Sequence, residues 1–228
     1  MKKNTGEQHL RFAVLAVDVA LMTVRDGRLL IRLAPVHRPP HFPNSKGLPG
    51  GLIDPKETAE EAALRIVKAK GHVESTVYME QLYTFSELNR DPRGRVVAVG
   101  YIALIPWDEL STSEREDTDD AWWVPIEEAR GLAYDHDLIR KTAHNRLRAR
   151  ATYTTIVSKL MPVEFTLTDL ERVYESILKT DLDKRNFRKK ILKIQVLTAL
   201  NRKRTGGAFR PAELYRFTSP SVKEIEIL

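Results

Sequence analysis

The sequence predicts an α+β protein in two parts, a mixed α/β part followed by a smaller helical part that ends in a β-hairpin. Three observations predict this fold. Strand and helix patterns alternate in the first half, two amphipathic helices follow Pro162, and the excess positive charge is confined to the last third. A chain of 228 residues is long for one domain and sufficient for two. We divide it into residues 1–148 and 149–228.

The first part opens on strand patterns. Phe12 to Leu21 is a nearly continuous apolar run, as expected of a strand buried on both faces. Asp26-Gly27 is a turn dipeptide, and the apolar residues 29–31 continue the pattern as a hairpin. Pro35 to Pro43 predicts a loop, because repeated prolines exclude a helix. Further strands are predicted at 78–85 and 96–105, with a charged loop at 89–95 between them.

Helical patterns alternate with these strands. After a tight loop at 47–51, a helix is predicted from about Thr58 to Lys70. Its core-facing residues are Ala62, Ala63, Ile66 and Val67. A shorter helix should contain Ile126 to Arg130, and a helical stretch from about His136 to Leu160 is closed by Pro162. The division between the two parts lies within this last stretch.

The second part has the pattern of two short helices and a hairpin. Thr166 and Asp169 resemble a capping box that begins the first helix. The second helix is expected from Lys184 to about Gln195. Its inward face carries Phe187, Ile191 and Ile194. Strands are expected at 196–200 and 213–217, around a turn that contains Gly206-Gly207. This order of elements is that of a winged helix-turn-helix domain.

The charge distribution predicts a polyanionic partner for this second part. Residues 151–228 hold 15 of the 37 Lys and Arg and 9 of the 31 Asp and Glu, which accounts for the whole net charge of +6. Ten basic residues and no acidic residue lie between Lys184 and Arg210. In the major groove of DNA, Arg and Asn read base edges, and Lys contacts phosphates. The residues assigned to DNA are Arg185, Asn186, Arg188, Lys189, Lys190, Lys193, Arg202, Lys203 and Arg204.

Composition excludes several other classes of protein. The absence of cysteine rules out disulfides, thiolate metal sites and a cysteine nucleophile, and it is consistent with a reducing cytosol. The first nine residues lack the apolar run of a signal peptide, and no window approaches the ~20 apolar residues that cross a bilayer. We therefore expect a cytoplasmic, nucleoid-associated protein with no membrane partner.

A family resemblance begins at Gly51. The run from Gly51 through Glu57 to Arg65 resembles the first half of the Nudix box, G-x5-E-x7-R, whose later glutamates bind Mg²⁺ against a diphosphate. Here the three glutamate positions and the following glycine position hold Ile66, Ala69, Lys70 and His72. The resemblance therefore implies a degenerate domain that keeps the fold but has no metal site and no catalytic residues. Glu57 is expected to pair with Arg65.

A degenerate Nudix domain before a winged helix resembles the NrtR family, the Nudix-related transcriptional regulators of bacterial NAD metabolism. The segments from Phe85 to Leu104 and from Tyr134 to Asp137 are similar to that family as well. The resemblance implies a homodimer that represses NAD-biosynthesis or salvage genes at a palindromic operator. It also implies a nucleotide effector, ADP-ribose or a related NAD derivative, with no required cofactor. The implied ligand residues are Arg32, Arg38, Gly50, Gly51, Phe85, Arg93 and Arg95.

Four alternatives to these assignments stay open. The chain could be an ADP-ribose pyrophosphatase with an auxiliary nucleic-acid-binding domain, in which Asp91 helps Glu57, Glu60 or Glu61 to bind metal. It could be an adaptor that uses the Nudix fold only for dimerisation. The winged helix could contact protein, or present only a solvated basic face. Arg93 and Arg95 could equally be surface arginines or touch DNA.

Overall fold

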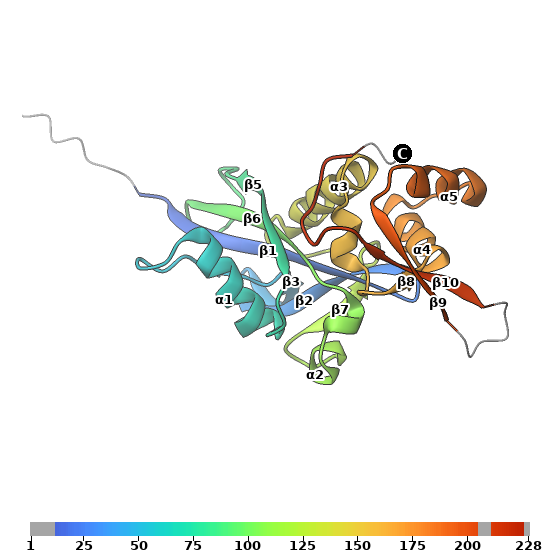
Figure 1. Ribbon diagram of the computed structural model, residues 1–228. Coiled ribbons are helices and arrows are strands. Elements are labelled where there is room, and N and C mark those ends of the chain that lie inside the picture. The colour runs from blue at the N-terminus through green and yellow to red at the C-terminus, as the bar shows by residue number, and fades with distance from the viewer. Residues whose placement is uncertain (1–11, 205–210, 226–228) are drawn as a thin grey trace, which may run out of the picture.

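The fold is seen in a computed structural model that describes residues 12–204 and 211–225 (Figure 1). In these residues the first part is built on a seven-stranded sheet with the order β3-β2-β1-β6-β5, in which β4 pairs with β1 and β7 pairs with β2. Its strands are β1 (Val14–Arg25), β2 (Arg28–Arg38), β3 (Phe42–Gly47), β4 (Gly50–Leu52), β5 (Tyr78–Phe85), β6 (Val96–Leu104) and β7 (Trp122–Pro125).

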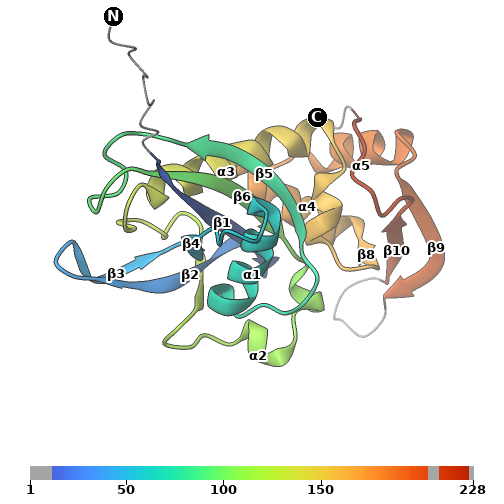
Figure 2. The same ribbon diagram turned by 90° about the vertical axis from the view of Figure 1, so that its left-hand side faces the viewer.

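Helices cover both faces of this sheet. Helix α1 (Ala59–Gly71) and helix α3 (His136–Tyr153) lie on opposite sides of it (Figure 2). Strand β1 turns Val19 and Leu21 toward the cluster that contains α1, and Met22 and Val24 toward the cluster that contains α3. Because successive side chains of a strand face opposite sides, a strand buried on both faces has a continuous apolar run, which explains the sequence of β1.

The second part follows α3 and a 3₁₀ turn (Ile156–Leu160). Its elements are β8 (Phe165–Thr166), α4 (Leu167–Leu178), α5 (Lys184–Lys193), β9 (Leu197–Arg204) and β10 (Ala212–Phe217). Thr166 caps α4 as predicted, because its side chain accepts from the N–H of Asp169 while the Asp169 carboxylate accepts from the N–H of Thr166. Asp183 caps α5 by accepting from the N–H groups of Arg185 and Asn186.

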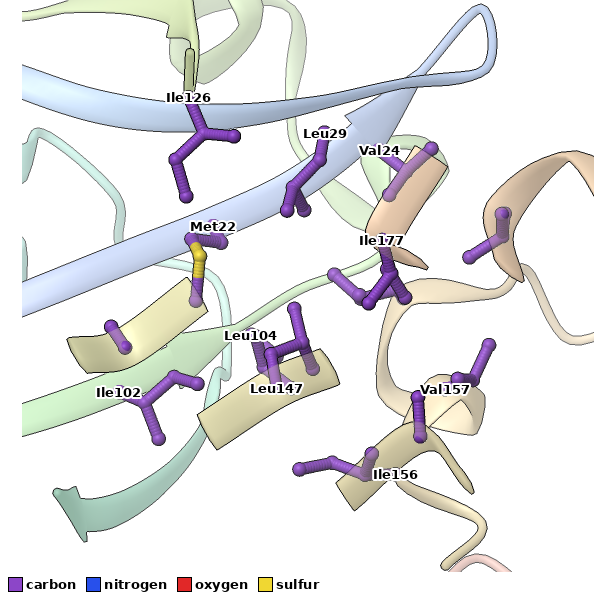
Figure 3. Close-up of a cluster of buried hydrophobic side chains, with 14 of the residues drawn as sticks. Met22, Val24, Leu29, Ile102, Leu104, Ile126, Leu147, Ile156, Val157 and Ile177 are labelled. Carbon is purple, nitrogen blue, oxygen red and sulfur yellow. The ribbon is translucent and has the colours of Figure 1, made fainter. Parts of the chain in front are cut away.

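One apolar core joins the two parts. Side chains from β1 and β6 meet Leu147 of α3, Val157 of the 3₁₀ turn and Ile177 of α4 (Figure 3). At the surface of this junction, Lys179 Nζ lies 3.0 Å from Glu127 Oε2. The predicted division after residue 148 falls inside α3, which continues unbroken to Tyr153. The division stays a prediction, since the helix belongs to both parts.

Three local expectations were wrong. The loop predicted from Pro35 to Pro43 is mostly strand, because β2 continues to Arg38 and pairs with β3 from Phe42 onward. The helix predicted around Ile126 to Arg130 is a turn after β7. The helical stretch predicted to reach Leu160 ends as an α-helix at Tyr153, and the 3₁₀ turn follows.

Most other predicted elements agree with the structure, except that the loop predicted at 47–51 contains the start of β4 at Gly50, and the strand predicted at 196–200 continues to Arg204 as β9. The Asp26-Gly27 turn joins β1 and β2, with φ of 50° and 72°. The strand predicted at 78–85 has the bounds of β5, and the predicted returning strand is β10. Within residues 12–204 and 211–225, no helix is long and apolar enough to cross a bilayer. Two short helices, a 3₁₀ turn at Trp107–Glu109 and α2 (Thr112–Arg115), precede β7.

Candidate ligand cavity and nucleic-acid interface

A cavity of about 220 Å³ opens between β1, β2, β4 and the start of α3. Its polar lining is Asp18, His37, Arg38, Lys70, Arg90, Asp91, Arg93, Tyr134 and His136. Four of these side chains are Lys or Arg and two are carboxylates. The cavity therefore presents an excess of positive charge, which suits an anionic ligand.

A buried ionic network forms one wall of the cavity. Arg90 Nη2 donates to Asp18 Oδ2 at 2.9 Å and to Asp135 Oδ1 at 2.6 Å, and its side chain is only 3% exposed. Burial by itself would raise the pKa of Asp18, but the neighbouring His136 and Arg90 together hold it below its ordinary value of 3.8. Asp18 is therefore ionised at neutral pH and fixes the Arg90 guanidinium in place.

His136 ties this network to the first turn of α3. The backbone N–H of Leu48 donates to His136 Nδ1 at 2.9 Å, so Nδ1 is an acceptor. In the neutral ring the proton is then on Nε2, which lies 3.2 Å from Asp18 Oδ1. The ring thereby connects β1, the β3–β4 turn and α3 at the cavity wall.

The two glycines of β4 let its backbone pack closely, Gly50 against Asp18 at the cavity and Gly51 against α1. A Cβ on Gly50 would collide with the Asp18 carboxylate, and a Cβ on Gly51 would lie 2.6 Å from Ile66 Cδ1. Lys70 Nζ donates to the carbonyl oxygen of Gly50 at 2.5 Å. Burial, and then the positive charge of Arg38, lowers the pKa of Lys70 from its ordinary 10.5.

The structure brings four of the seven predicted ligand residues to this cavity, namely Arg38, Gly50, Gly51 and Arg93. It places the other three elsewhere. Arg32 is fully buried, donates to the carbonyl of Gly71 at 2.9 Å at the end of α1, and stacks over Trp123. Phe85 is a core residue packed on Gly100, and Arg95 donates to the carbonyls of Ser86 and Glu87.

Several cavity residues were not singled out by the sequence analysis. Asp18 carried the clearest signal, because it is the one acidic residue in the apolar run from Phe12 to Leu21, and a buried carboxylate needs a partner. Arg90 and Tyr134 carried no sequence signal beyond the family resemblance, because they lie in loops that only the fold brings to the cavity.

The side chains around the box do not fit a divalent metal ion. Arg65 Nε donates to Glu57 Oε2 at 2.9 Å, the expected pairing, and Glu61 takes part in the capping box of α1. Ile66 is buried under Gly51, and Lys70 places an ammonium group at the cavity. In residues 12–204 and 211–225 no three His, Cys, Asp or Glu side chains cluster as metal ligands would.

The second candidate site is the exposed surface of α5. Arg185, Lys189 and Lys193 are exposed and lie four residues apart, so they follow one another along one face of the helix. We call these three residues the cation row. Among the described residues no carboxylate forms an ion pair with any of them. Phe187 and Ile191 face the core and anchor the helix to α4, where Tyr174 stacks against Phe187.

The other residues assigned to DNA divide into two groups. Lys190 and Lys203 are, like the cation row, without ion pairs to described residues. The remaining four have acidic partners, which for Asn186 is the N-cap residue of α5 itself. Arg188 pairs with Glu171 at 2.5 Å, Arg202 with Glu164, Arg204 with Asp169 at 2.8 Å, and Asn186 Nδ2 donates to Asp183 at 2.7 Å. The predicted wing tip, with Gly206-Gly207, lies outside the described residues.

Comparison with known proteins matches both parts of the chain. The NUDIX domain model matches residues 13–146, and the NrtR DNA-binding winged helix domain model matches residues 157–217. The ADPR responsive transcriptional repressor NtrR of Acinetobacter baylyi is 34% identical over 210 residues, which are 90% of this chain and 82% of that protein. These matches confirm the predicted order of a Nudix domain followed by a winged helix.

Two solved structures of Shewanella oneidensis NrtR resemble this chain. Its complex with a 27mer DNA has a TM-score of 0.78 at 32% identity, covering 90% of this chain and 93% of that one. Its NUDIX domain complexed with ADP ribose has a TM-score of 0.52 at 32% identity, covering 63% of this chain and 94% of that one. With a Nudix domain, an NrtR winged helix and a repressor relative across nine tenths of its length, this chain belongs to the NrtR family of Nudix-related transcriptional regulators.

Proposed function

We propose that this chain is a transcriptional repressor that binds a palindromic operator as a homodimer and senses ADP-ribose or a related NAD derivative. Its regulated genes would be those of NAD biosynthesis or salvage. The cation row is the observation that carries the proposal, because three exposed cations without carboxylate partners on a helix of a winged helix domain suit double-stranded DNA. The Acinetobacter and Shewanella relatives, named for ADP-ribose response and solved with DNA, support it.

The paired residues define how α5 would be presented to DNA. Arg188 holds α5 to α4 through Glu171, and Arg204 holds the wing strand β9 to the start of α4 through Asp169. Helix and wing are therefore oriented by ion pairs, while the cation row is left to contact the nucleic acid. A two-fold dimer would place two such helices in successive major grooves, with half-sites ~10–10.5 bp apart or multiples of that spacing.

The cavity suits the effector part of the proposal. ADP-ribose carries two phosphates, and Arg38, Lys70 and Arg93 line the cavity beside the closely approaching backbone of Gly50. The Arg93 guanidinium lies 5.4 Å from the Tyr134 ring centroid, so an aromatic face and a cation are adjacent at the cavity wall. Both features favour a nucleotide diphosphate over an uncharged ligand.

Helix α3 offers a physical route from the cavity to the winged helix. Its first residue, His136, lines the cavity, and His144 two turns later donates through Nε2 to the carbonyl of Ile177 at 2.9 Å, near the end of α4. A ligand that shifts the first turn of α3 would also move the C-terminal end of α4, which His144 contacts. Since coupling is reciprocal, operator DNA must change ADP-ribose affinity by the factor by which ADP-ribose changes DNA affinity.

The proposal includes the absence of hydrolysis by the usual Nudix mechanism. It is supported by the Glu57–Arg65 pair, the Asp91–Arg93 pair and the ammonium group of Lys70 at the cavity. Incubating the full chain with ADP-ribose and Mg²⁺ and measuring released AMP tests this part. Turnover would favour the alternative, an ADP-ribose pyrophosphatase with an auxiliary nucleic-acid-binding domain.

The central experiment measures binding by fluorescence anisotropy to DNA upstream of the chain's own gene and of NAD-metabolism genes, with and without ADP-ribose. Binding that resists competitor DNA and changes with ADP-ribose is expected. Binding that ignores ADP-ribose would remove that effector and keep the repressor. No specific binding to these fragments, together with no thermal shift by ADP-ribose or NAD, would favour an adaptor that uses the Nudix fold only as a scaffold.

A further inference from the structure

Lys70 is the residue of the cavity that the proposed function leaves without an explanation. It lies in the last turn of α1, at a position where the Nudix box has a metal-binding glutamate. Its ammonium group carries three donors, of which one is used by the carbonyl of Gly50. The other two donors have no hydrogen-bond partner among the described residues, and they lie at the wall of a cavity that Arg38 and Arg93 also line.

The local packing supports a fixed place for this ammonium group. The C-terminal end of a helix favours a cation, because the unpaired carbonyls there carry partial negative charge. Ile66, one turn earlier at another glutamate position, is buried beneath Gly51 and holds β4 against α1. This packing places the Gly50 carbonyl of β4 within hydrogen-bond distance of Lys70 Nζ.

The carboxylates nearby are already committed to other cations. Asp18 is held by Arg90 and His136, and Asp91 accepts two hydrogen bonds from the Arg93 side chain. A divalent cation placed here would lie beside Lys70 with no free carboxylate cluster to bind it. An anion in the same place would instead meet Lys70, Arg38 and the Nη1 group of Arg93, which does not donate to Asp91. The lowered pKa of Lys70, due to burial and then to Arg38, is consistent with cations crowded together in the absence of an anion.

We propose that the Lys70 ammonium group takes over the role of the divalent cation, so that this chain binds the diphosphate of its nucleotide without metal. The inference rests on the proposed nucleotide-sensing function and deepens it. A protein that binds the diphosphate through its own cation needs no ion to be recruited. An ammonium group only donates hydrogen bonds and has no open coordination position, so it also cannot supply the activated water that a metal ion provides for hydrolysis.

The test is calorimetric titration of the full chain with ADP-ribose and, separately, with inorganic pyrophosphate, in EDTA and in MgCl₂. We expect the wild-type affinity for ADP-ribose to be the same in the two buffers, whereas pyrophosphate, which itself chelates Mg²⁺, is compared between variants in EDTA. Lys70→Met should weaken both by about 10- to 100-fold, the ratio for one lost charge-assisted hydrogen bond, and Lys70→Arg should weaken them less. Lys68→Ala is the matched control, since Lys68 is two residues away, pairs with Glu74 and lies outside the cavity.

The outcomes separate this inference from the proposed function. Wild-type binding of ADP-ribose that EDTA abolishes would overturn the role of Lys70 and leave the sensor intact. Equal affinities of wild type and Lys70→Met would overturn it as well. If ADP-ribose binds in neither buffer, the effector of the proposed function is wrong, and the pyrophosphate titration alone tests the role of Lys70. Metal-independent binding of pyrophosphate that depends on Lys70 would then support it, and no binding would overturn it.

Discussion

The cavity and the cation row both collect positive charge, but they hold it in opposite ways. Arg90 is buried and pairs with Asp18 and Asp135, because an unpaired charge in the interior is costly. Arg185 is exposed, and no carboxylate of the described residues pairs with it. The cavity can therefore select one small anion by fixed geometry, whereas α5 can exchange counterions for the phosphates of a polyanion. Under the proposed function, one chain would thus carry a geometric and an electrostatic recognition site for phosphate.

The largest effect in this comparison is expected at Arg90. Arg90→Ala leaves the buried Asp18 with His136 alone and removes the guanidinium from the partly buried Asp135, and breaking a buried pair costs about 3–5 kcal/mol of unfolding free energy. Urea unfolding followed by circular dichroism measures it. Arg25→Ala is the control, because Arg25 is 54% exposed, its one ion pair among the described residues is with exposed Asp26, and it otherwise stacks over Trp107, so the change should cost about 1 kcal/mol or less. Equal effects of the two changes would mean that the buried network contributes no more than a surface pair.

The second effect concerns the cation row. Replacing Arg185, Lys189 and Lys193 by Ala together should weaken operator binding by on the order of 10²-fold at physiological salt, because each lost phosphate contact removes about one released counterion. The slope of log affinity against log salt should fall by about 2, because Lys189 and Lys193 are assigned to phosphates whereas Arg185 is assigned to base edges. Affinity for ADP-ribose should not change, because the row lies far from the cavity lining in the sequence and contributes none of it.

A charge-matched control separates local contact from net charge. The triple change of Arg25, Lys56 and Lys68 to Ala removes the same number of positive charges from the first part of the chain, away from α5. It should alter the salt slope little. If this control weakens DNA binding as much as the change on α5, the cation row is not the contact surface. The exposed charges of α5 then have no role in DNA binding beyond their contribution to net charge.

A third effect separates paired from unpaired cations within the winged helix. Arg188 lies on α5 between residues of the cation row, yet its guanidinium pairs with Glu171, whose side chain is only 1% exposed. Arg188→Ala should lower the unfolding free energy by about 1–3 kcal/mol, because a buried carboxylate loses its donors. Arg185→Ala should leave stability unchanged and lower DNA affinity. Thermal unfolding and fluorescence anisotropy on both variants measure these effects. A loss of stability in Arg185→Ala, or a loss of DNA affinity with unchanged stability in Arg188→Ala, would contradict the two roles.

The sequence predicted what depends on neighbouring residues and missed what depends on distant ones. The capping box at Thr166 and the bounds of β5 are local and were found. Pro35 was assigned to a loop, but a proline is tolerated in a strand where its missing N–H is not needed, and β2 continues through it to pair with β3. The prediction that Arg32 contacts the ligand also depended on distant residues, because only the packed fold shows that Arg32 donates to the carbonyl of Gly71 at the end of α1.

The smallest effect tests a buried carboxylate that forms no ion pair with a described residue, although the Arg32 guanidinium lies close enough for the two charges to interact. Glu114 is 5% exposed and accepts hydrogen bonds from the N–H groups of Glu74, Ser75 and Ser111. Burial would raise its pKa, but these hydrogen bonds outweigh it and lower the pKa to about 2 from 4.5. Its stabilisation is therefore complete above pH 4.5 and is lost as the pH falls toward 2.

Glu114→Gln should lower the unfolding free energy by about 1 kcal/mol at pH 7, because a neutral amide accepts hydrogen bonds less strongly than a carboxylate. The gap between wild type and variant should narrow as the pH falls from 4.5 toward 2, since the wild-type side chain becomes neutral in that range. Urea unfolding across this range measures it, with Glu60→Gln on the exposed surface of α1 as the control. A gap that stays constant with pH would show that the hydrogen bonds hold the shape of the side chain rather than its charge. The backbone N–H groups at Glu114 would then stabilise the ionised form of a buried carboxylate less than the Arg90 guanidinium stabilises that of Asp18.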